Sequence, residues 1–251
     1  MDAHMTVLIS GGDSFTAGSE LPGPEHAWPQ LLADRMNWNH CATAMGGASN
    51  SNIRRNVMDA VQKYNHLDLH VAVMWSFPNR YEFRFTYETG QRDSPWYNIN
   101  PWTYNNQNFA DHFENPNDQT LDFQKKNRQN AEARGMSDFA RMYVDHVADS
   151  EYWELYTSWC EIVMLQNYLQ VNNIPYTFMQ VDNSLWHNNF ALDTTLSTLF
   201  ETIDASKWPM ATGMYNWAKQ TKQPFYTTHP QEIAHVEWIN MLYDRIDHGH
   251  T

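Results

Sequence analysis

The sequence predicts an α/β fold, a three-layer α/β/α sandwich around a central parallel sheet. Runs of β-branched and aliphatic residues, typical of buried strands, occupy residues 5–10, 38–43, 70–75 and 174–181. Segments with helical periodicity lie between these runs, at residues 27–36, 50–64 and 138–171. Strands that alternate with helices pair in parallel through right-handed crossovers, so helices are expected on both faces of the sheet. This is the flavodoxin-like arrangement.

A last helix is predicted near the end of the chain. Apolar residues recur there with a period of about 3.6 residues, at Ile233, Val236, Ile239 and Tyr243. Pro230 suits the first position of that helix, because its missing N–H is not needed there.

An insertion at about residues 81–136 interrupts this alternation within what is expected to be a single domain, 1–251. The segment is rich in Trp, Tyr and Asn and has no sustained period. Loops of this length are usually functional or disordered, and the aromatic content argues against simple disorder. Its rings stack on the sugar faces of a substrate, pack the insertion onto the core or form a subunit contact.

A Gly-Asp-Ser sequence directly follows the first predicted strand. Gly12 ends that strand, and Asp13 and Ser14 enter a turn at the carboxyl edge of the sheet, where α/β folds build their sites. A serine there is a candidate nucleophile if a base reaches it. Asp13 and Ser14 are equally suited to capping a helix, and both interpretations stay open.

His229 is the candidate base. It precedes Pro230, on a loop just before the last predicted helix. The chain has 12 histidines, and a lone histidine is more often structural than catalytic.

Together these segments resemble the SGNH (GDSL-type) hydrolase family. Gly12, Asp13 and Ser14 match its first block, and His229 matches the histidine of its last block. Gly47, within residues 44–52, matches the glycine of its second block, whose N–H helps to hold an oxyanion. The resemblance implies a Ser14 nucleophile, a His229 base, and an oxyanion hole that includes the N–H groups of Ser14 and Gly47.

The third block of that family, usually Gly-x-Asn-Asp after the third strand, is altered here. Ser76 stands where the glycine is expected, and Asn79 is the nearest side-chain amide. The resemblance therefore implies Asn79 as the third member of the oxyanion hole, with Ser76, Arg80 and Asp13 as supporting residues.

The acid of the family's Asp-x-x-His block is missing, because Tyr226 stands three residues before His229. A tyrosine has an ordinary pKa of about 10 and is neutral at neutral pH, so it cannot replace the aspartate. We expect a backbone carbonyl or water to orient His229. Asp182, after the fourth strand, is the alternative, and Glu232 is a weaker one.

Two classes of function follow from these residues. The first is a serine esterase or deacylase that cleaves a small-molecule or glycan ester, through a Ser-His dyad or an incomplete triad. The second is a binding or structural module that keeps the fold without the chemistry, for example a virion component. The altered third block and the missing aspartate favour the second class, whereas Ser14, Gly47 and His229 favour the first. The Gly-Asp-Ser-Phe-Thr-x-Gly and Trp28-Pro29 sequences look closest to divergent SGNH-like proteins of tailed phages.

Composition excludes several other classes. A net charge of −13 and few basic clusters argue against a nucleic-acid partner. Neither an apolar run of membrane-spanning length nor a secretory leader is visible, which predicts a cytoplasmic or virion-associated protein without a membrane partner. No spacing typical of a zinc site or phosphate loop occurs, so neither metal nor cofactor is expected. Cys41 and Cys160 are expected to be free thiols, with a single disulfide as the alternative.

Overall fold

The computed structural model describes residues 6–84, 96–100, 135–148, 150–186 and 190–246. Its centre is a four-stranded parallel sheet with the strand order β2-β1-β3-β6. The strands are β1 (Val7–Gly11), β2 (Asn39–Ala42), β3 (Leu69–Trp75) and β6 (Tyr176–Gln180). Each falls within or next to a run that the sequence predicts as a strand, and the predicted α/β fold class is confirmed.

The burial of the strands explains their composition. Every residue of β1, β3 and β6 is buried, as expected for parallel strands covered on both faces. The edge strand β2 is partly exposed and accordingly contains polar residues.

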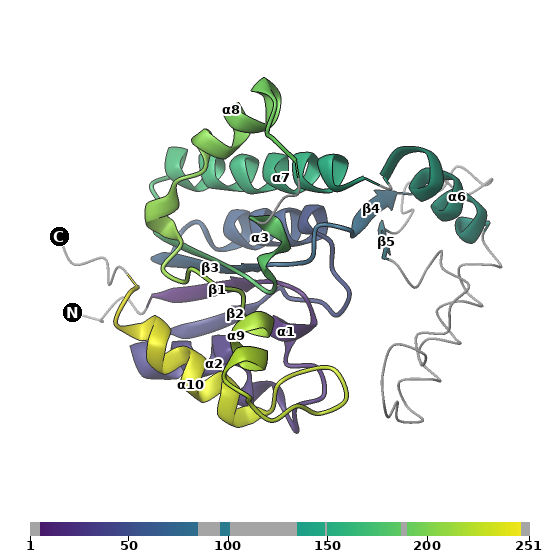
Figure 1. Ribbon diagram of the computed structural model, residues 1–251. Coiled ribbons are helices and arrows are strands. Elements are labelled where there is room, and N and C mark those ends of the chain that lie inside the picture. The colour runs from purple at the N-terminus through teal and green to yellow at the C-terminus, as the bar shows by residue number, and fades with distance from the viewer. Residues whose placement is uncertain (1–5, 85–95, 101–134, 149, 187–189, 247–251) are drawn as a thin grey trace.

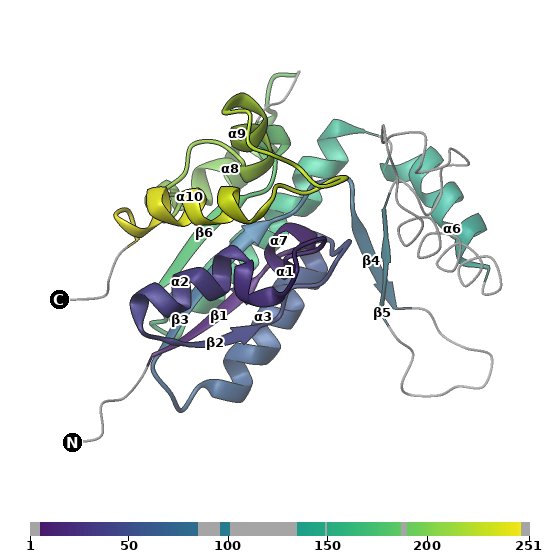
Figure 2. The same cartoon turned by 90° about the horizontal axis from the view of Figure 1, so that it is seen from below.

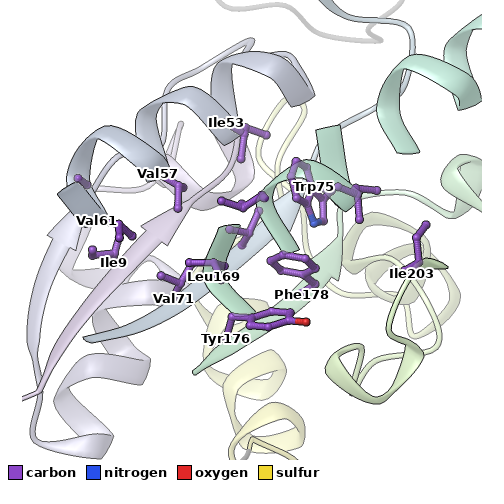
Figure 3. Packing of buried hydrophobic residues seen from close by; sticks show 14 of the residues in the cluster. Ile9, Ile53, Val57, Val61, Val71, Trp75, Leu169, Tyr176, Phe178 and Ile203 are labelled. Atoms are coloured by element: carbon purple, nitrogen blue, oxygen red, sulfur yellow. The ribbon is translucent and has the colours of Figure 1, made fainter. Parts of the chain in front are cut away.

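Helices cover both faces of the sheet (Figure 1). One face carries α3 (Asn50–Tyr64), α7 (Glu151–Val171) and α8 (Thr194–Thr202). Figure 3 shows the core on this side, where Ile9, Val57, Trp75 and Phe178 pack together. The other face carries α1 (Ser14–Ala17), α2 (Trp28–Met36), α9 (Met214–Gln220) and α10 (Glu232–Tyr243). Leu8 and Met74 pack there against Trp28 and Trp238.

Two helix predictions need correction. The helix expected over 138–171 is broken into α6 (Met136–Tyr143), a π-helical turn (Val144–Ala148) and α7, and only α7 covers the sheet. Helix α10 begins at Glu232 rather than at Pro230, because Pro230 pairs with Phe225 in an isolated β-bridge before the helix. Short 3₁₀ turns complete the described elements: Pro24–His26, Asn183–Leu185 and Ala205–Lys207.

The described part of the insertion forms a unit outside the central sheet. Strands β4 (Tyr81–Arg84) and β5 (Trp96–Ile99) pair in antiparallel fashion, and Figure 2 shows them beside α6 and away from the parallel strands. Tyr81, Ile99 and Ala140 form the centre of a small separate core. Residues 101–134 lie outside the described residues, and the single-domain organisation stays a prediction.

Two further sequence expectations concern thiols and membranes. Cys41 and Cys160 are both free and half-buried, so the expectation of free thiols is confirmed over the disulfide. Within the described ranges, the helices are too short or too polar to cross a bilayer.

Candidate active site

The Gly-Asp-Ser sequence forms a tight turn between β1 and α1. Ser14 is the first residue of α1 and is half-buried, and Asp13 is its buried N-cap. The Asp13 carboxylate accepts a hydrogen bond of 3.0 Å from the Phe15 N–H. Gly12 is required for close packing here, because a Cβ on it would collide with Thr16 and lie 3.1 Å from the Met74 carbonyl oxygen. The capping interpretation of Asp13 is therefore confirmed, and it leaves the Ser14 side chain at the sheet edge.

A buried polar cluster supports this turn. Asp13 Oδ2 accepts hydrogen bonds from Ser76 Oγ and from Arg80 Nη1, each 2.8 Å long. Burial lowers the pKa of Arg80, and the adjacent Asp13 carboxylate opposes that shift. The structure thus brings together Asp13, Ser76 and Arg80, the residues expected from the sequence to support the site.

Asn50 extends this cluster, although the sequence motifs do not point to it. Its Oδ1 accepts from the Ser76 N–H at 2.8 Å, and its Nδ2 donates to Ser158 Oγ at 3.0 Å. The first residue of α3 is thereby joined to the end of β3 and to α7. Asn50 lies three residues after Gly47, so the Gly-Gly-Ala-Ser-Asn segment itself was the available signal.

His229 lies on the loop between α9 and α10, and its partner is Glu20. His229 Nδ1 lies 3.2 Å from Glu20 Oε2. The same oxygen accepts the backbone N–H groups of Thr228, at 2.9 Å, and of His229, at 3.0 Å. Thr228 Oγ1 lies 2.5 Å from His229 Nδ1. The His229 and Glu20 side chains are 13% and 17% exposed, so the pair is largely shielded from water.

The contact with Glu20 favours one tautomer of His229. An ionised carboxylate can only accept, so this contact is a hydrogen bond when Nδ1 carries the proton. Nε2 is then the nitrogen with a free lone pair. Burial alone would raise the pKa of Glu20, but hydrogen bonds from His229 and the Thr228 backbone outweigh it and hold the pKa below its ordinary value.

Glu20 corrects the expectation for the group that orients His229. A backbone carbonyl or water was expected, with Asp182 or Glu232 as alternatives. Asp182 instead caps a 3₁₀ turn through the Ser184 N–H at 2.8 Å, and Glu232 accepts from the Tyr226 hydroxyl at 2.7 Å. Glu20 is separated from His229 by 209 positions in the sequence, so no local pattern connects the two.

The backbone of Glu20 is unusual as well. Its φ is +69°, in the left-handed region that residues other than glycine rarely adopt. Such a conformation persists only where surrounding contacts stabilise it, and it is frequent at functional sites. The three hydrogen bonds to Glu20 Oε2 supply that stabilisation.

Phe15 links the histidine to the nucleophile turn. The Phe15 and His229 rings lie with centroids 4.8 Å apart, and Phe15 directly follows Ser14. Among the described residues no hydrogen bond joins Ser14 to His229. Catalytic hydrogen bonds are often long before substrate binds and tighten in the complex with substrate.

The candidate oxyanion donors Gly47 and Asn79 differ in what the structure shows of them. Gly47 lies on the loop before α3 with φ +74°, a conformation that favours glycine. Asn79 is half-buried on the turn between β3 and β4, and takes part in none of the described hydrogen bonds. Its role in an oxyanion hole stays a prediction.

His235, the other histidine near the site, has a structural contact. Its buried Nδ1 accepts the Trp28 N–H at 3.1 Å, which satisfies a free donor at the start of α2. Burial lowers the pKa of His235 to about 4, and the charge of His229 contributes to that shift. Across the described ranges, no three His, Cys, Asp or Glu side chains gather in a way that could hold a metal ion.

Comparisons with known proteins find solved structures whose fold is similar to that of this chain, at low sequence identity. No protein-family model matches the sequence, and no curated protein matches it. The esterase EstA from Pseudoalteromonas sp. is 14% identical, with a TM-score of 0.49 over 96% of this chain and 95% of that one. The acetyl xylan esterase AlAXEase is 10% identical, with a TM-score of 0.45 over 96% and 100%. A putative lipolytic protein of the G-D-S-L family from Desulfitobacterium hafniense DCB-2 is 12% identical, with a TM-score of 0.26 over 78% and 96%.

Proposed function

We propose that this protein is a serine esterase or deacylase whose triad is Ser14, His229 and Glu20. The contact between Glu20 and His229 Nδ1 carries the proposal, because it leaves Nε2 as an acceptor for a proton. The position of Phe15, next to Ser14 and against the His229 ring, supports the assignment of Ser14 as the nucleophile. Glu20 supplies the acid that the sequence motif lacks.

In the acylation step, Ser14 Oγ attacks the ester carbonyl carbon while His229 Nε2 takes the hydroxyl proton. The carbonyl electron pair moves to oxygen and forms a tetrahedral oxyanion, which the backbone N–H groups of Ser14 and Gly47 stabilise. Glu20 stabilises the imidazolium that forms. Collapse of the intermediate breaks the bond to the leaving oxygen, which receives the proton from His229.

Deacylation repeats these steps with water. His229 Nε2 takes a proton from water as the water oxygen bonds to the acyl carbon of the Ser14 ester. The second tetrahedral intermediate then expels Ser14 Oγ, which regains its proton, and releases the free acid. No group other than water is consumed, so the chain needs no cofactor for this reaction.

The substrate class proposed is an ester of a small molecule or a glycan. Trp96 on β5 is 45% exposed, and its ring lies 4.9 Å from the Arg55 guanidinium carbon. An exposed indole offers a large and rigid contact area, which suits a sugar ring. Acyl groups on a carbohydrate are therefore included among the substrates to test.

The experiment that tests the function is covalent labelling by a fluorophosphonate. We expect one adduct per chain, on the tryptic peptide that contains Ser14, and loss of both labelling and aryl-acetate hydrolysis in Ser14→Ala. Ser19→Ala is the matched control, because Ser19 lies on the adjacent half-buried segment and has no proposed role.

The non-catalytic module is the competing function. A folded wild-type protein that neither reacts with fluorophosphonate at Ser14 nor hydrolyses any aryl ester or acetylated glycan would support that class. Activity that persists in Ser14→Ala would equally overturn the proposed triad.

A further inference from the structure

The β4–β5 hairpin is fastened to the loops that carry the proposed site. The Ser49 N–H donates to Asn98 Oδ1 at 3.0 Å, and Asn52 Nδ2 donates to Glu82 Oε1 at 2.6 Å. Arg55 adds a bidentate pair, at 3.1 and 2.7 Å, to the Glu82 carboxylate. Both strands of the hairpin are thus tied to the first turns of α3 and to its N-cap.

A second connection joins the hairpin to the nucleophile turn. Arg80 immediately precedes β4, and its buried guanidinium bonds to Asp13 Oδ2 at 2.8 Å. The Arg80 and Asp13 side chains are 5% and 0% exposed, so this ion pair is shielded from water. The base of the hairpin therefore has a defined position relative to Ser14, which directly follows Asp13.

Asn100 comes at the end of β5, where these connections hold the chain. It is 8% exposed, and its Nδ2 lies 3.4 Å from the point that a Cβ on Gly47 would occupy. A hydrogen-bond donor of the insertion thus borders the glycine whose N–H is proposed to bind the oxyanion. Asn79, the amide expected from the sequence, has no comparable contact with Gly47 among the described residues.

We propose that Asn100 is a catalytic residue that donates a hydrogen bond from Nδ2 to the oxyanion. The inference rests on the proposed function. When Ser14 Oγ bonds to the carbonyl carbon, negative charge appears on the carbonyl oxygen, and an amide held in place beforehand stabilises it without reorganisation. Asn100 transfers no proton in this step.

This assignment gives the insertion a chemical role. The altered block after β3 lacks its usual amide position, and the hairpin supplies an amide from a different part of the chain. The polar contacts of Glu82 and Asn98 with α3 then serve to hold Asn100 against Gly47.

The test compares Asn100→Ala, Asn100→Asp and Asn79→Ala with wild type and Ser14→Ala, on an aryl acetate. Loss of one oxyanion donor costs about 10²–10³ in turnover, so we expect that fall in kcat for Asn100→Ala, with KM little changed. Asn100→Asp keeps the side-chain shape but places a carboxylate beside the oxyanion, and is expected to be slower still. Asn79→Ala tests the competing assignment, because Asn79 is the amide that the family resemblance implies as the donor.

For the proteins that keep Ser14, each rate is divided by the fraction of Ser14 that fluorophosphonate labels after long incubation, which corrects for misfolded protein. The folding of Ser14→Ala is checked by thermal unfolding instead. If both Asn100 variants match wild type while Ser14→Ala is inactive, the Asn100 role is wrong and the proposed esterase stands. The Asn100 role is also wrong, and the esterase stands, if only Asn79→Ala loses turnover. If wild type shows no turnover that depends on Ser14, the proposed function and the Asn100 role both fail.

Discussion

Glu20→Gln is the substitution that most directly tests the proposed triad. All three described hydrogen bonds to Glu20 converge on Oε2, from His229 Nδ1 and from the N–H groups of Thr228 and His229. The carbonyl oxygen of a glutamine can take the place of Oε2 and accept all three. The variant therefore removes the negative charge while the loop geometry and the tautomer of His229 are kept.

The size of the effect follows from that geometry. Replacing a charge-assisted hydrogen bond by a neutral one costs about 1.4 kcal/mol, or about tenfold in kcat. The upper bound is the attraction between the carboxylate and the imidazolium, about 4 kcal/mol for unit charges about 4 Å apart at an effective dielectric constant of about 20. That value corresponds to about 10³-fold in kcat. We expect a loss between these limits, since Glu20 is 17% exposed.

The assay measures kcat and KM for aryl-acetate hydrolysis, with thermal unfolding of each variant as a check on folding. Glu232→Gln is the matched control, because Glu232 bonds to the Tyr226 hydroxyl at 2.7 Å and makes no described contact with His229. A folded Glu20→Gln variant as fast as wild type would refute the role of Glu20. A large loss in Asp182→Asn would identify Asp182 as the acid instead.

Three further predictions concern stability and the oxyanion loop. Arg80→Ala strips a buried Asp13 carboxylate of its partner and should cost about 3–5 kcal/mol of unfolding free energy in urea titrations; a loss below about 1 kcal/mol would contradict the buried pair. His235 has a folded pKa of about 4 and an ordinary value of 6.5, so the unfolded chain binds more protons between these values and stability falls as pH falls. Unfolding free energy should drop by about 2 kcal/mol between about pH 7 and about pH 5, and His235→Gln should remove that slope. Gly47→Ala should cost about 1–2 kcal/mol of unfolding free energy because φ is +74°, although its Cβ would lie in ordinary contact, 3.4 Å from Asn100 Nδ2; unchanged stability in urea titrations would show that the loop accommodates a Cβ.

The sequence by itself predicted the layers of the fold, because residues that face the core are apolar and their spacing follows the helix or strand that contains them. Strands β1 and β3 are buried throughout and are continuous apolar runs, and α3 shows apolar residues at helical spacing. The same apolar spacing gave a wrong prediction where a helix packs on something other than the sheet. The apolar rhythm over 138–171 spans α6 and α7, but α6 packs on the hairpin and not on the sheet.

Sequence motifs also predicted that Asp13 and Ser14 lie in a turn directly after β1, since a glycine ends the strand and an aspartate favours a helix cap. The structure brings Ser76 and Arg80 to Asp13, as expected, because all three lie at the carboxyl ends of the neighbouring strands β1 and β3. Adjacent parallel strands bring such residues together without any further information.

Only the tertiary structure identified Glu20 and Asn100. Neither lies at a regular position of a helix or strand, so periodicity carries no information about them. Glu20 meets His229 because its backbone adopts a left-handed conformation and the last loop folds back over α1. Asn100 meets Gly47 because the hairpin is tied to α3 and to Asp13. Contacts of this kind depend on how separate loops are positioned by the packing of the whole chain, which neither periodicity nor a local motif reveals.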